Sequence, residues 1–177
     1  MDFFELINTR ESCRNYKPDP VERAKLEQLI EAARLAPSAC NSQPWSFTVV
    51  TGSRCAQLAP CLQELGMNKF ASQAPAFIVV TEEKASLAAT VASRMKSQEY
   101  AQMDVGIATA HLCLAATQLG LGTCIMGWFN EEKVKALLDI PQQKRVRLVV
   151  SVGYRADGAP RPKKRKETQQ ICRFLED

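Results

Sequence analysis

Residues 105–129 read VGIATAHLCLAATQLGLGTCIMGWF and contain 25 consecutive positions without Asp, Glu, Lys or Arg. A run of this length is long enough to raise the question of a membrane span. The run contains His111 and Gln118, and Gly120-Leu121-Gly122 interrupts it. We therefore expect a helix that ends near Leu119 and a strand after it, and no membrane span.

The size of the chain makes this helix difficult to cover. With 177 residues, 46% of them hydrophobic and 24% charged, the chain has the composition of one globular domain, which we expect to span residues 1–177. A helix that is apolar on all sides is normally buried. A single domain of this size covers such a helix with difficulty, so we expect a second copy of the chain to help, in a homodimer.

The flanking sequence alternates helical and strand patterns. Asp19-Pro20-Val21-Glu22 combines an N-cap acid, a proline and a glutamate in the order typical of a helix start. Apolar residues then follow at helical spacing until Pro37 and include Leu26, Leu29, Ile30, Ala33 and Leu35. A polar loop is expected at residues 37–44.

The remaining elements are shorter. We expect strands at 45–50, 76–80 and 146–152, and helices at 2–8, 54–65, 131–138 and 168–175. Together with the elements of residues 105–129, they indicate an α+β fold or a three-layer α/β sandwich with one core.

Several kinds of chemistry are disfavoured. The closest pair of the seven cysteines, Cys55 and Cys61, has five residues between its members, whereas zinc and iron–sulfur sites need tighter spacing. We expect reduced, mostly buried thiols. His111 is the only histidine, and we expect it to be a hydrogen-bonded core residue. A Ser-His-Asp triad and a metal site with two histidines are therefore disfavoured. Gly120-x-Gly122 lacks the third glycine of a dinucleotide loop.

Positive charge is concentrated near the C-terminus. Residues 161–166, RPKKRK, hold five of the 23 basic residues, which leaves 18 basic against 19 acidic residues elsewhere. Such a run is a solvated tail, a nucleic-acid patch or a phosphate-binding element. No aromatic residue lies between Tyr154 and Phe174, which disfavours a single-stranded nucleic-acid site.

A second basic motif lies near the N-terminus, at Arg10-x-Ser12-x-Arg14. In an extended segment these three side chains point the same way, and Glu11 between them points away. Two guanidinium groups and a hydroxyl on one side can donate several charge-assisted hydrogen bonds to a phosphate. The motif suits an anion site, but taken alone it is unspecific and is more typical of surface arginines in an exposed loop.

Four motifs in order resemble the FMN-dependent nitroreductase family. They are Arg10-x-Ser12-x-Arg14, the loop PSACNSQPW at 37–45, the stretch GLGTCIMGWF at 120–129, and KKRK at 163–166. The resemblance covers nearly the whole chain. It implies a three-layer α/β/α sandwich with a central mixed, mostly antiparallel sheet, in an intertwined homodimer that holds two FMN molecules at the subunit interface.

The resemblance also implies roles for individual residues. The FMN phosphate would be bound by Arg10, Ser12, Lys163 and Arg165, with Arg14 toward the ribityl chain or the pyrimidine edge of the ring. From the other subunit, the flavin would be approached by Pro37, Ser38, Ala39 and Asn41. Its inner face would be lined by Cys124, Ile125, Met126 and Gly127, with a backbone N–H near Met126 or Gly127 directed at flavin N5.

The implied activity is an NAD(P)H-dependent oxidoreductase. Electrons would pass from NADH or NADPH through bound FMN to nitroaromatics, quinones or similar acceptors with ping-pong kinetics, and no side chain would act as a catalytic acid or base. The sequence does not select between the two nucleotides. We expect Cys124 to be a packing residue and not a redox thiol.

The sequence departs from the family at three points. Glu11 stands where many relatives carry a second basic residue, and His111 where many carry Asn or Gln. The short chain predicts reduced helical excursions and an open acceptor pocket.

Two other readings stay open. One is a non-catalytic protein that binds a flavin, or a nucleic acid through residues 161–166, and in the latter case affinity would fall steeply with salt. The other keeps the flavin but changes the chemistry, to dehydrogenation of peptide-derived rings or reductive removal of halogens. The acidic N-terminal residues Asp2 and Glu5 are unlike a signal peptide, so we expect a cytoplasmic protein.

Overall fold

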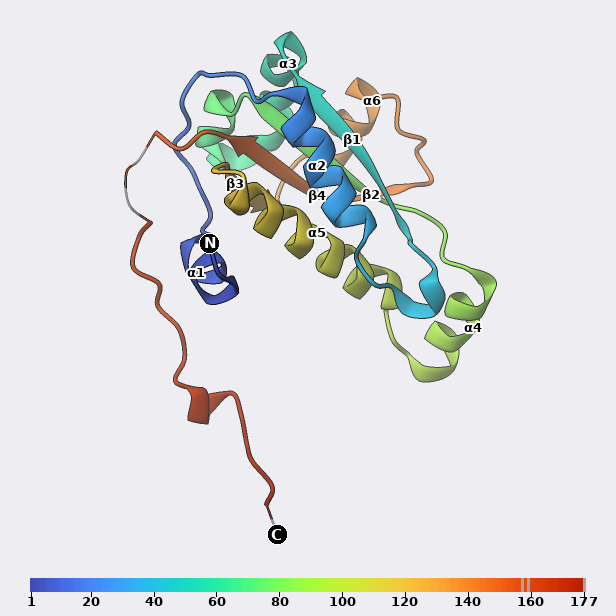
Figure 1. Cartoon of the computed structure of the whole chain (residues 1–177). Coiled ribbons are helices and arrows are strands. Elements are labelled where there is room, and N and C mark those ends of the chain that lie inside the picture. Colours follow the sequence, from blue (N-terminus) through green and yellow to red (C-terminus); the bar gives the residue numbers. More distant parts are fainter. Residues whose placement is uncertain (157, 159, 177) are drawn as a thin grey trace.

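A four-stranded antiparallel sheet with the order β1-β2-β4-β3 forms the middle layer of the structure (Figure 1). The computed structural model describes residues 1–156, 158 and 160–176. The strands are β1 (Trp45–Thr51), β2 (Ala76–Glu82), β3 (Gly122–Met126) and β4 (Arg145–Gly153). All three strand pairs are antiparallel, and the one parallel contact in the described part of the chain is an isolated bridge between Ser12 and Thr123.

The two central strands are buried on both faces. Residues 76–81 of β2 are all buried, because side chains alternate between two covered sides of the sheet. Ile78 pairs with Val150 on one side, and Val79 pairs with Val149 on the other. The continuous apolar run, without polar alternation, is typical of a strand covered by helices above and below.

Two long helices cover the first face. They are α2 (Arg23–Arg34) and α5 (Tyr100–Gln118), which pack on each other and on the sheet. The buried core on this side includes Leu26, Leu29, Val105, Ala108, Leu112, Ala116, Ile78, Val80, Val150 and Val152. Burial of these side chains is the main stabilisation of this layer.

The second face is covered by α3 (Ser53–Leu62), α6 (Glu131–Leu137) and a 3₁₀ turn at Lys69–Gln73. Leu58, Leu62 and Val134 pack there on the sheet residues Phe77, Val79 and Val149. Helices therefore lie on both faces, and the predicted three-layer α+β sandwich is confirmed. All four strands of the sheet are antiparallel, where a mixed but mostly antiparallel sheet was expected.

Two elements lie outside these layers. The short helix α1 (Phe3–Thr9) packs against α5, and α4 (Leu87–Lys96) contacts the 3₁₀ turn at Ala39–Asn41. Helix α4 was not expected from the sequence, and its apolar residues Leu87, Val91 and Met95 are exposed.

Three predicted features differ in the structure. Helix α2 begins at Arg23 and not near Pro20, because Glu22 is extended and its carboxylate accepts a hydrogen bond from the Tyr154 hydroxyl (2.5 Å). The helix ends at Arg34, so Leu35 lies beyond it and is 64% exposed. His111 is half-buried on α5 and not in the core.

The predicted helix at 168–175 is also wrong. Only a 3₁₀ turn forms there, at Thr168–Gln170. Residues 160–176, called the tail below, lead away from the body of the molecule (Figure 1). Ile171, Phe174 and Leu175 are exposed. The tail therefore has no apolar surface of its own chain against which a helix could pack.

The N-terminal segment is attached to the edge of the sheet. The Cys13 amide donates to the Thr123 carbonyl (2.8 Å), and the buried Tyr16 hydroxyl lies 2.8 Å from Ser151 Oγ. Gly122 allows this close approach, because a Cβ at that position would lie 2.8 Å from both Cβ and Sγ of Cys13.

Substitution Gly122→Ala should lower the free energy of unfolding by about 1–3 kcal/mol, as expected for overpacking of a tight contact. Denaturant unfolding followed by circular dichroism measures the loss. Gly127→Ala is the matched control, because its Cβ would meet only Leu148 Cδ2, at 4.0 Å. Equal stability losses in the two variants would contradict the argument.

Candidate functional site

A strongly cationic pocket of ≈ 300 Å³ lies between the N-terminal segment and the tail. It is lined by Arg10, Glu11, Ser12, Arg14, Arg161, Pro162, Lys163, Lys164 and Arg165. Two basic motifs about 150 residues apart are thus brought together at one place. The predicted phosphate-binding residues Arg10, Ser12, Lys163 and Arg165 all belong to this lining, while their role stays a prediction.

Glu11 joins the two sides of this pocket. Its Oε1 lies 2.5 Å from Arg155 Nη2, and its Oε2 accepts hydrogen bonds from Nε (3.0 Å) and the backbone N–H (3.2 Å) of Arg161. Arg161 also donates to the Ser12 carbonyl (2.6 Å). The expectation that Glu11 points away is wrong, but two guanidinium groups neutralise it, so it does not offset the charge of the other basic residues.

The electrostatics of Glu11 follow from these partners. Burial alone would raise its pKa, since its side chain is only 10% exposed. Hydrogen bonds from Arg161 and the positive charges of Arg155 and Arg161 outweigh burial and hold the pKa of Glu11 below its ordinary value. Glu11 is therefore ionised at neutral pH and fixes the start of the tail against residues 10–14.

Lys163 has a structural role besides its place in the pocket. Its ammonium group donates to the carbonyls of Ile7 (2.6 Å) and Asn8, at the C-terminal end of α1. A cation at this end of a helix satisfies free carbonyls. Burial and the nearby charges of Arg10 and Arg165 lower the pKa of Lys163. An anion in the pocket would share Lys163 with α1.

Two other predicted residues adjoin the pocket. The Arg14 guanidinium lies 6.0 Å from the centre of the Phe70 ring, which orients this exposed side chain. Cys124 is buried on β3, and burial raises the pKa of its thiol although the Arg14 charge opposes this effect. A thiol that stays protonated is a poor nucleophile, which supports a packing role for Cys124.

Strand β3 carries three of the four residues predicted to face a flavin. Cys124 and Met126 are buried and Ile125 is 44% exposed, while Gly127 follows directly after the strand. Because Ser12 bridges to Thr123, β3 lies directly beside the N-terminal segment. The β3 residues and the cationic pocket are thus at one edge of the sheet.

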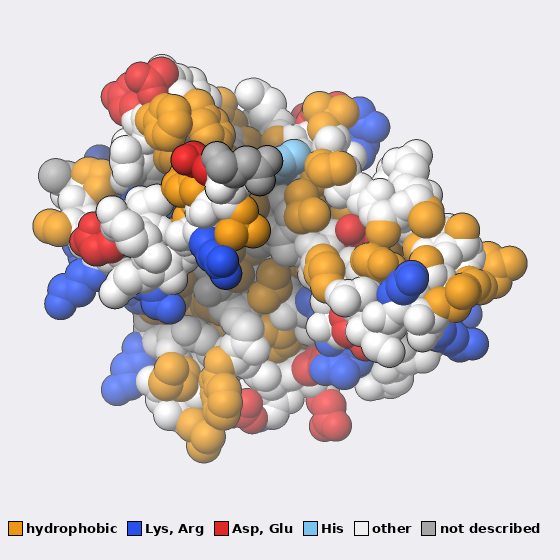
Figure 2. All heavy atoms as spheres, turned by 90° about the horizontal axis from the view of Figure 1, so that it is seen from below, with side chains coloured by type: hydrophobic (Ala, Val, Ile, Leu, Met, Phe, Trp, Pro, Cys, Tyr) orange, Lys and Arg blue, Asp and Glu red, His pale blue; other side chains and the backbone are white. Residues whose placement is uncertain are grey.

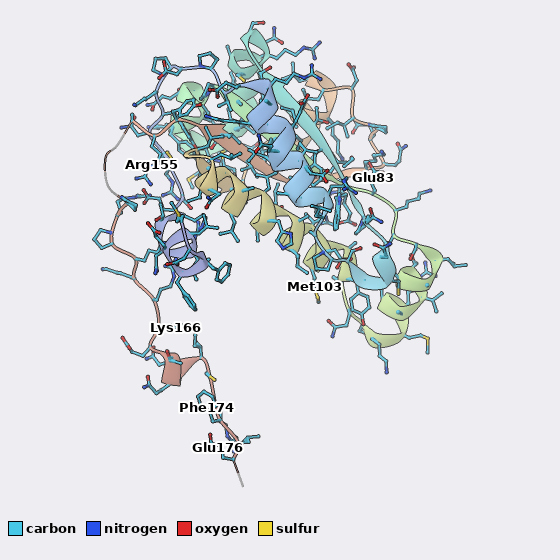
Figure 3. The ribbon with its side chains drawn as sticks, in the orientation of Figure 1. Glu83, Met103, Arg155, Lys166, Phe174 and Glu176 are labelled. Atoms are coloured by element: carbon cyan, nitrogen blue, oxygen red, sulfur yellow. The ribbon has the colours of Figure 1, made fainter. Side chains whose placement is uncertain are left out.

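The predicted loop residues Pro37, Ser38, Ala39 and Asn41 lie elsewhere. Their 3₁₀ turn contacts α4 and α5, near the end of α5 at which Met103 lies (Figure 3). Arg155 and Lys166 lie at the other end of the molecule, beside α1 and along the tail (Figure 3). One chain therefore does not bring the loop to the pocket.

Other kinds of site find little support in the geometry. Within residues 1–156, 158 and 160–176, no group of three or more His, Cys, Asp or Glu side chains could hold a metal ion. In the same part of the chain, no helix is long and apolar enough to cross a membrane. None of the seven cysteines forms a disulfide, and four are buried: Cys13, Cys55, Cys113 and Cys124.

Sequence reasoning missed the partners that orient the predicted residues. Arg155 and Phe70 belong to no motif, and their contacts with Glu11 and Arg14 depend on how distant segments pack. A third residue, Asp104, was also missed. In the sequence it is marked only by its position, as an acid directly before the uncharged run that begins at residue 105. Asp104 is buried and bonded to the 37–44 loop.

Known proteins resemble this chain over most of its length. The sequence model of the nitroreductase family matches residues 7–65 and 53–154. A protein of Archaeoglobus fulgidus, provisionally named NADH dehydrogenase/NAD(P)H nitroreductase, is 35% identical over 161 residues, which cover 86% of this chain and 85% of the relative.

Solved structures agree with the sequence match. The crystal structure of a nitroreductase family protein from Streptococcus pneumoniae has a TM-score of 0.85 at 27% identity and covers 98% of this chain and 100% of its own. An FMN-dependent nitroreductase from Clostridium difficile has a TM-score of 0.80 at 25% identity, with 97% and 98% covered.

Substitution Glu11→Gln should lower the free energy of unfolding at pH 7 by about 1–3 kcal/mol, because a partly buried pair of charge-assisted contacts is weakened. Because the pKa of Glu11 is lower in the folded state than in the unfolded state, ionised Glu11 stabilises the fold. This stabilisation is fully present above the unfolded-state pKa of about 4.3 and is lost as the pH falls through the folded-state pKa. The difference between variant and wild type should therefore be constant near neutrality and shrink in acid.

Denaturant unfolding of the protein without added ligand, at several pH values between about 7 and 3, measures this difference. Glu27→Gln is the control: Glu27 pairs with Arg23 at 2.7 Å, but both side chains are exposed, so its effect on the free energy of unfolding should be much smaller than that of Glu11→Gln. A Glu11 effect that persists unchanged in acid would refute the assigned cause.

Proposed function

This chain belongs to the nitroreductase family, a family of oxidoreductases, and we propose that it uses bound FMN to transfer electrons from NADH or NADPH to nitroaromatic, quinone or similar acceptors. The observation that carries the proposal is the cationic pocket, in which basic residues from both ends of the chain meet. A solved relative at TM-score 0.80 is an FMN-dependent nitroreductase, which supports the choice of cofactor.

The residues of the pocket fit a phosphate group. Arg10, Arg14 and Arg165 supply fixed positive charge, and the Ser12 hydroxyl adds a hydrogen-bond donor. The only acid in the lining, Glu11, is already paired with Arg155 and Arg161. A phosphate dianion with several acceptor oxygens matches this set of donors. We assign the phosphate of FMN to this pocket.

The flavin ring would lie against β3. Buried Cys124 and Met126 are fixed in the sheet, and the exposed Gly127 carries no side chain that would keep a ligand from the backbone. FMN, when bound, supplies the electron-transfer chemistry. The chain would orient the ring, donate a backbone hydrogen bond near Met126 or Gly127 toward N5, and supply positive charge from Arg14.

No side chain is required as a proton donor or acceptor in this scheme. The one histidine, His111, is half-buried on α5 and does not line the cationic pocket. Donor and acceptor would occupy the same open binding face in turn, which predicts ping-pong kinetics.

A homodimer completes this site. Helix α5 is uncharged from Val105 onward, but Met103 and Ile107 are 48% and 39% exposed, and Phe3 and Phe4 on α1 are exposed as well. Figure 2 shows hydrophobic side chains spread over the face of the molecule that is seen from below the view of Figure 1. A second copy would cover this surface.

Intertwining of the two chains is supported by the tail. Ile171, Phe174 and Leu175 are 70–79% exposed on a tail that leads away from its own chain (Figure 1). These side chains would be buried against the partner. The partner would in turn supply its 37–44 loop to the pocket that one chain leaves incomplete.

Substitution Arg165→Ala should weaken FMN binding about 10- to 100-fold, because a hydrogen bond to a charged group contributes about 1.5–3 kcal/mol. Titration of the protein into FMN, followed by flavin fluorescence, measures the dissociation constant. Lys166→Ala is the matched control: it removes a neighbouring positive charge that is not part of the pocket lining. Equal affinity of Arg165→Ala and wild type would overturn the phosphate assignment.

The same wild-type preparation tests the activity. Anaerobic addition of NADH or NADPH should bleach the absorption bands of bound oxidised flavin, and the nucleotide that does so is the donor. A protein that binds FMN but is reduced by neither nucleotide would favour the non-catalytic flavin-binding alternative. A protein that does not bind FMN would overturn the proposal.

Substitution Ile107→Glu should convert the dimer to a monomer, because a charge would be buried in the interface without a partner. Sedimentation velocity at micromolar concentration distinguishes the two forms. Leu65→Asp is the control, since Leu65 is 84% exposed on a 3₁₀ turn that follows α3, on the opposite face of the sheet from α5. A wild-type monomer, or an unchanged dimer in Ile107→Glu, would contradict this interface.

A further inference from the structure

We propose that Asp104 is a positioning residue for the FMN site, which holds the 37–44 loop in the conformation that the partner subunit's flavin requires. This inference rests on the proposed function, since it assigns a purpose to the loop only if the loop contacts FMN. Asp104 belongs to none of the motifs discussed above. It is buried on α5 and has a single bonded partner, Ala39.

Asp104 is a buried acidic residue. It lies in the second turn of α5 and is 5% exposed, among the buried residues Val105 and Ala108 of the same helix. Both of its oxygens point at one group, the backbone N–H of Ala39, at 3.2 and 3.1 Å. Burial of a carboxylate is costly unless hydrogen bonds compensate for the lost water.

The bond to Ala39 satisfies a backbone N–H that the 3₁₀ turn itself leaves without a partner. Ser38 is the N-cap of the 3₁₀ turn at Ala39–Asn41, but its side chain makes no capping hydrogen bond to the turn. Its Oγ instead accepts from the Gln43 backbone N–H at 2.9 Å. Asp104 therefore supplies from α5, 65 residues away, an acceptor for the first free backbone N–H of the turn.

The loop needs such support because its backbone is strained. Cys40, Asn41 and Gln43 have φ values of 52°, 48° and 47°, in the left-handed region that residues other than glycine seldom occupy. Each such residue costs about 1 kcal/mol or more, so the conformation persists only where its surroundings impose it. A second contact, from the Ser86 backbone N–H to Ser42 Oγ (2.7 Å), holds the end of the loop.

The strain has a consequence for the ligand. Ser38 and Ala39 are half-buried, whereas Asn41 is exposed and its side-chain oxygen is held by Gln43 Nε2 at 3.2 Å. The loop thus presents a fixed polar surface away from its own chain before any partner binds. A preorganised surface binds more tightly than one that must first be ordered. Asp104 would keep the loop in this state.

Asp104→Ala removes the acceptor. The variant dimer should bind FMN about 10-fold or more weakly than the wild-type dimer, as for loss of a hydrogen bond to a charged group. Asp104→Asn retains one carbonyl oxygen of the same geometry and should restore most of the affinity. Thr109→Val is the matched control, because Thr109 is buried on α5 but bonds only within the helix, to the Val105 carbonyl at 2.7 Å.

Hydrogen exchange of the FMN-free protein provides a readout that does not depend on the cofactor. Peptides covering residues 37–44 should exchange faster in Asp104→Ala than in wild type, with Asp104→Asn between them and Thr109→Val like wild type. Thermal unfolding of all four proteins separates local loosening of the loop from a general loss of stability. Thr109→Val serves as the reference for a general loss of stability.

The outcomes are distinct. Weaker FMN binding with faster loop exchange in Asp104→Ala, rescued by Asp104→Asn, supports the proposal. Faster loop exchange with unchanged FMN affinity, or equal affinity losses in Asp104→Ala and Thr109→Val at equal stability, overturns it. Absence of FMN binding by wild type with an Asp104-dependent loop would instead overturn the proposed function, and leave Asp104 as a loop support alone.

Discussion

The attachment of the N-terminal segment to the edge of β3 is the constraint on which the candidate site depends. One backbone hydrogen bond, from Cys13 to Thr123, and the close approach permitted by Gly122 fix residues 10–14 beside the sheet. Glu11 then holds the base of the tail through Arg161, and Lys163 holds α1. The positive charge of the tail reaches the pocket only because this edge is in place. If the N-terminal segment lost its contact with β3, the basic residues would therefore no longer lie together in one pocket, although none of them would have been substituted.

Sequence periodicity predicted the elements whose burial follows their pattern. The end of α5 and the start of β3 agree with expectation, because Gly120 adopts a left-handed φ of 76° that ends the helix where the glycine stands. Helix α4 was not predicted, although Ser86 caps it by accepting a hydrogen bond from the Ala89 amide. The large apolar side chains of this helix face outward. Leu35 and the tail were misjudged for a related reason: apolar side chains were assigned to packing that one chain does not provide.

The site was predictable as a set of charges and not as a geometry. Arg10, Ser12, Arg14, Lys163 and Arg165 line one pocket, and their role in binding a phosphate stays a prediction. The neutralisation of Glu11 by Arg155 and the use of Lys163 by the carbonyls of α1 depend on contacts between segments about 150 residues apart. No local pattern encodes such contacts. The same holds for Asp104, whose burial is evident only once α5 is placed against the loop.

The division of the proposed site between two ends of the molecule couples cofactor binding to dimerisation. The loop is held on the α4 side of the molecule and the cationic pocket lies at the other edge, so a complete site would form only in the dimer. A ligand that binds only the dimer stabilises it by mass action, and by the same linkage dimerisation strengthens ligand binding. Preorganisation of the loop by Asp104 and of the pocket by Glu11 would reduce the ordering required when the two meet. On this view two acids of the chain, the buried Asp104 and the partly buried Glu11, would set how tightly the cofactor and the second subunit bind, although neither would be a catalytic group.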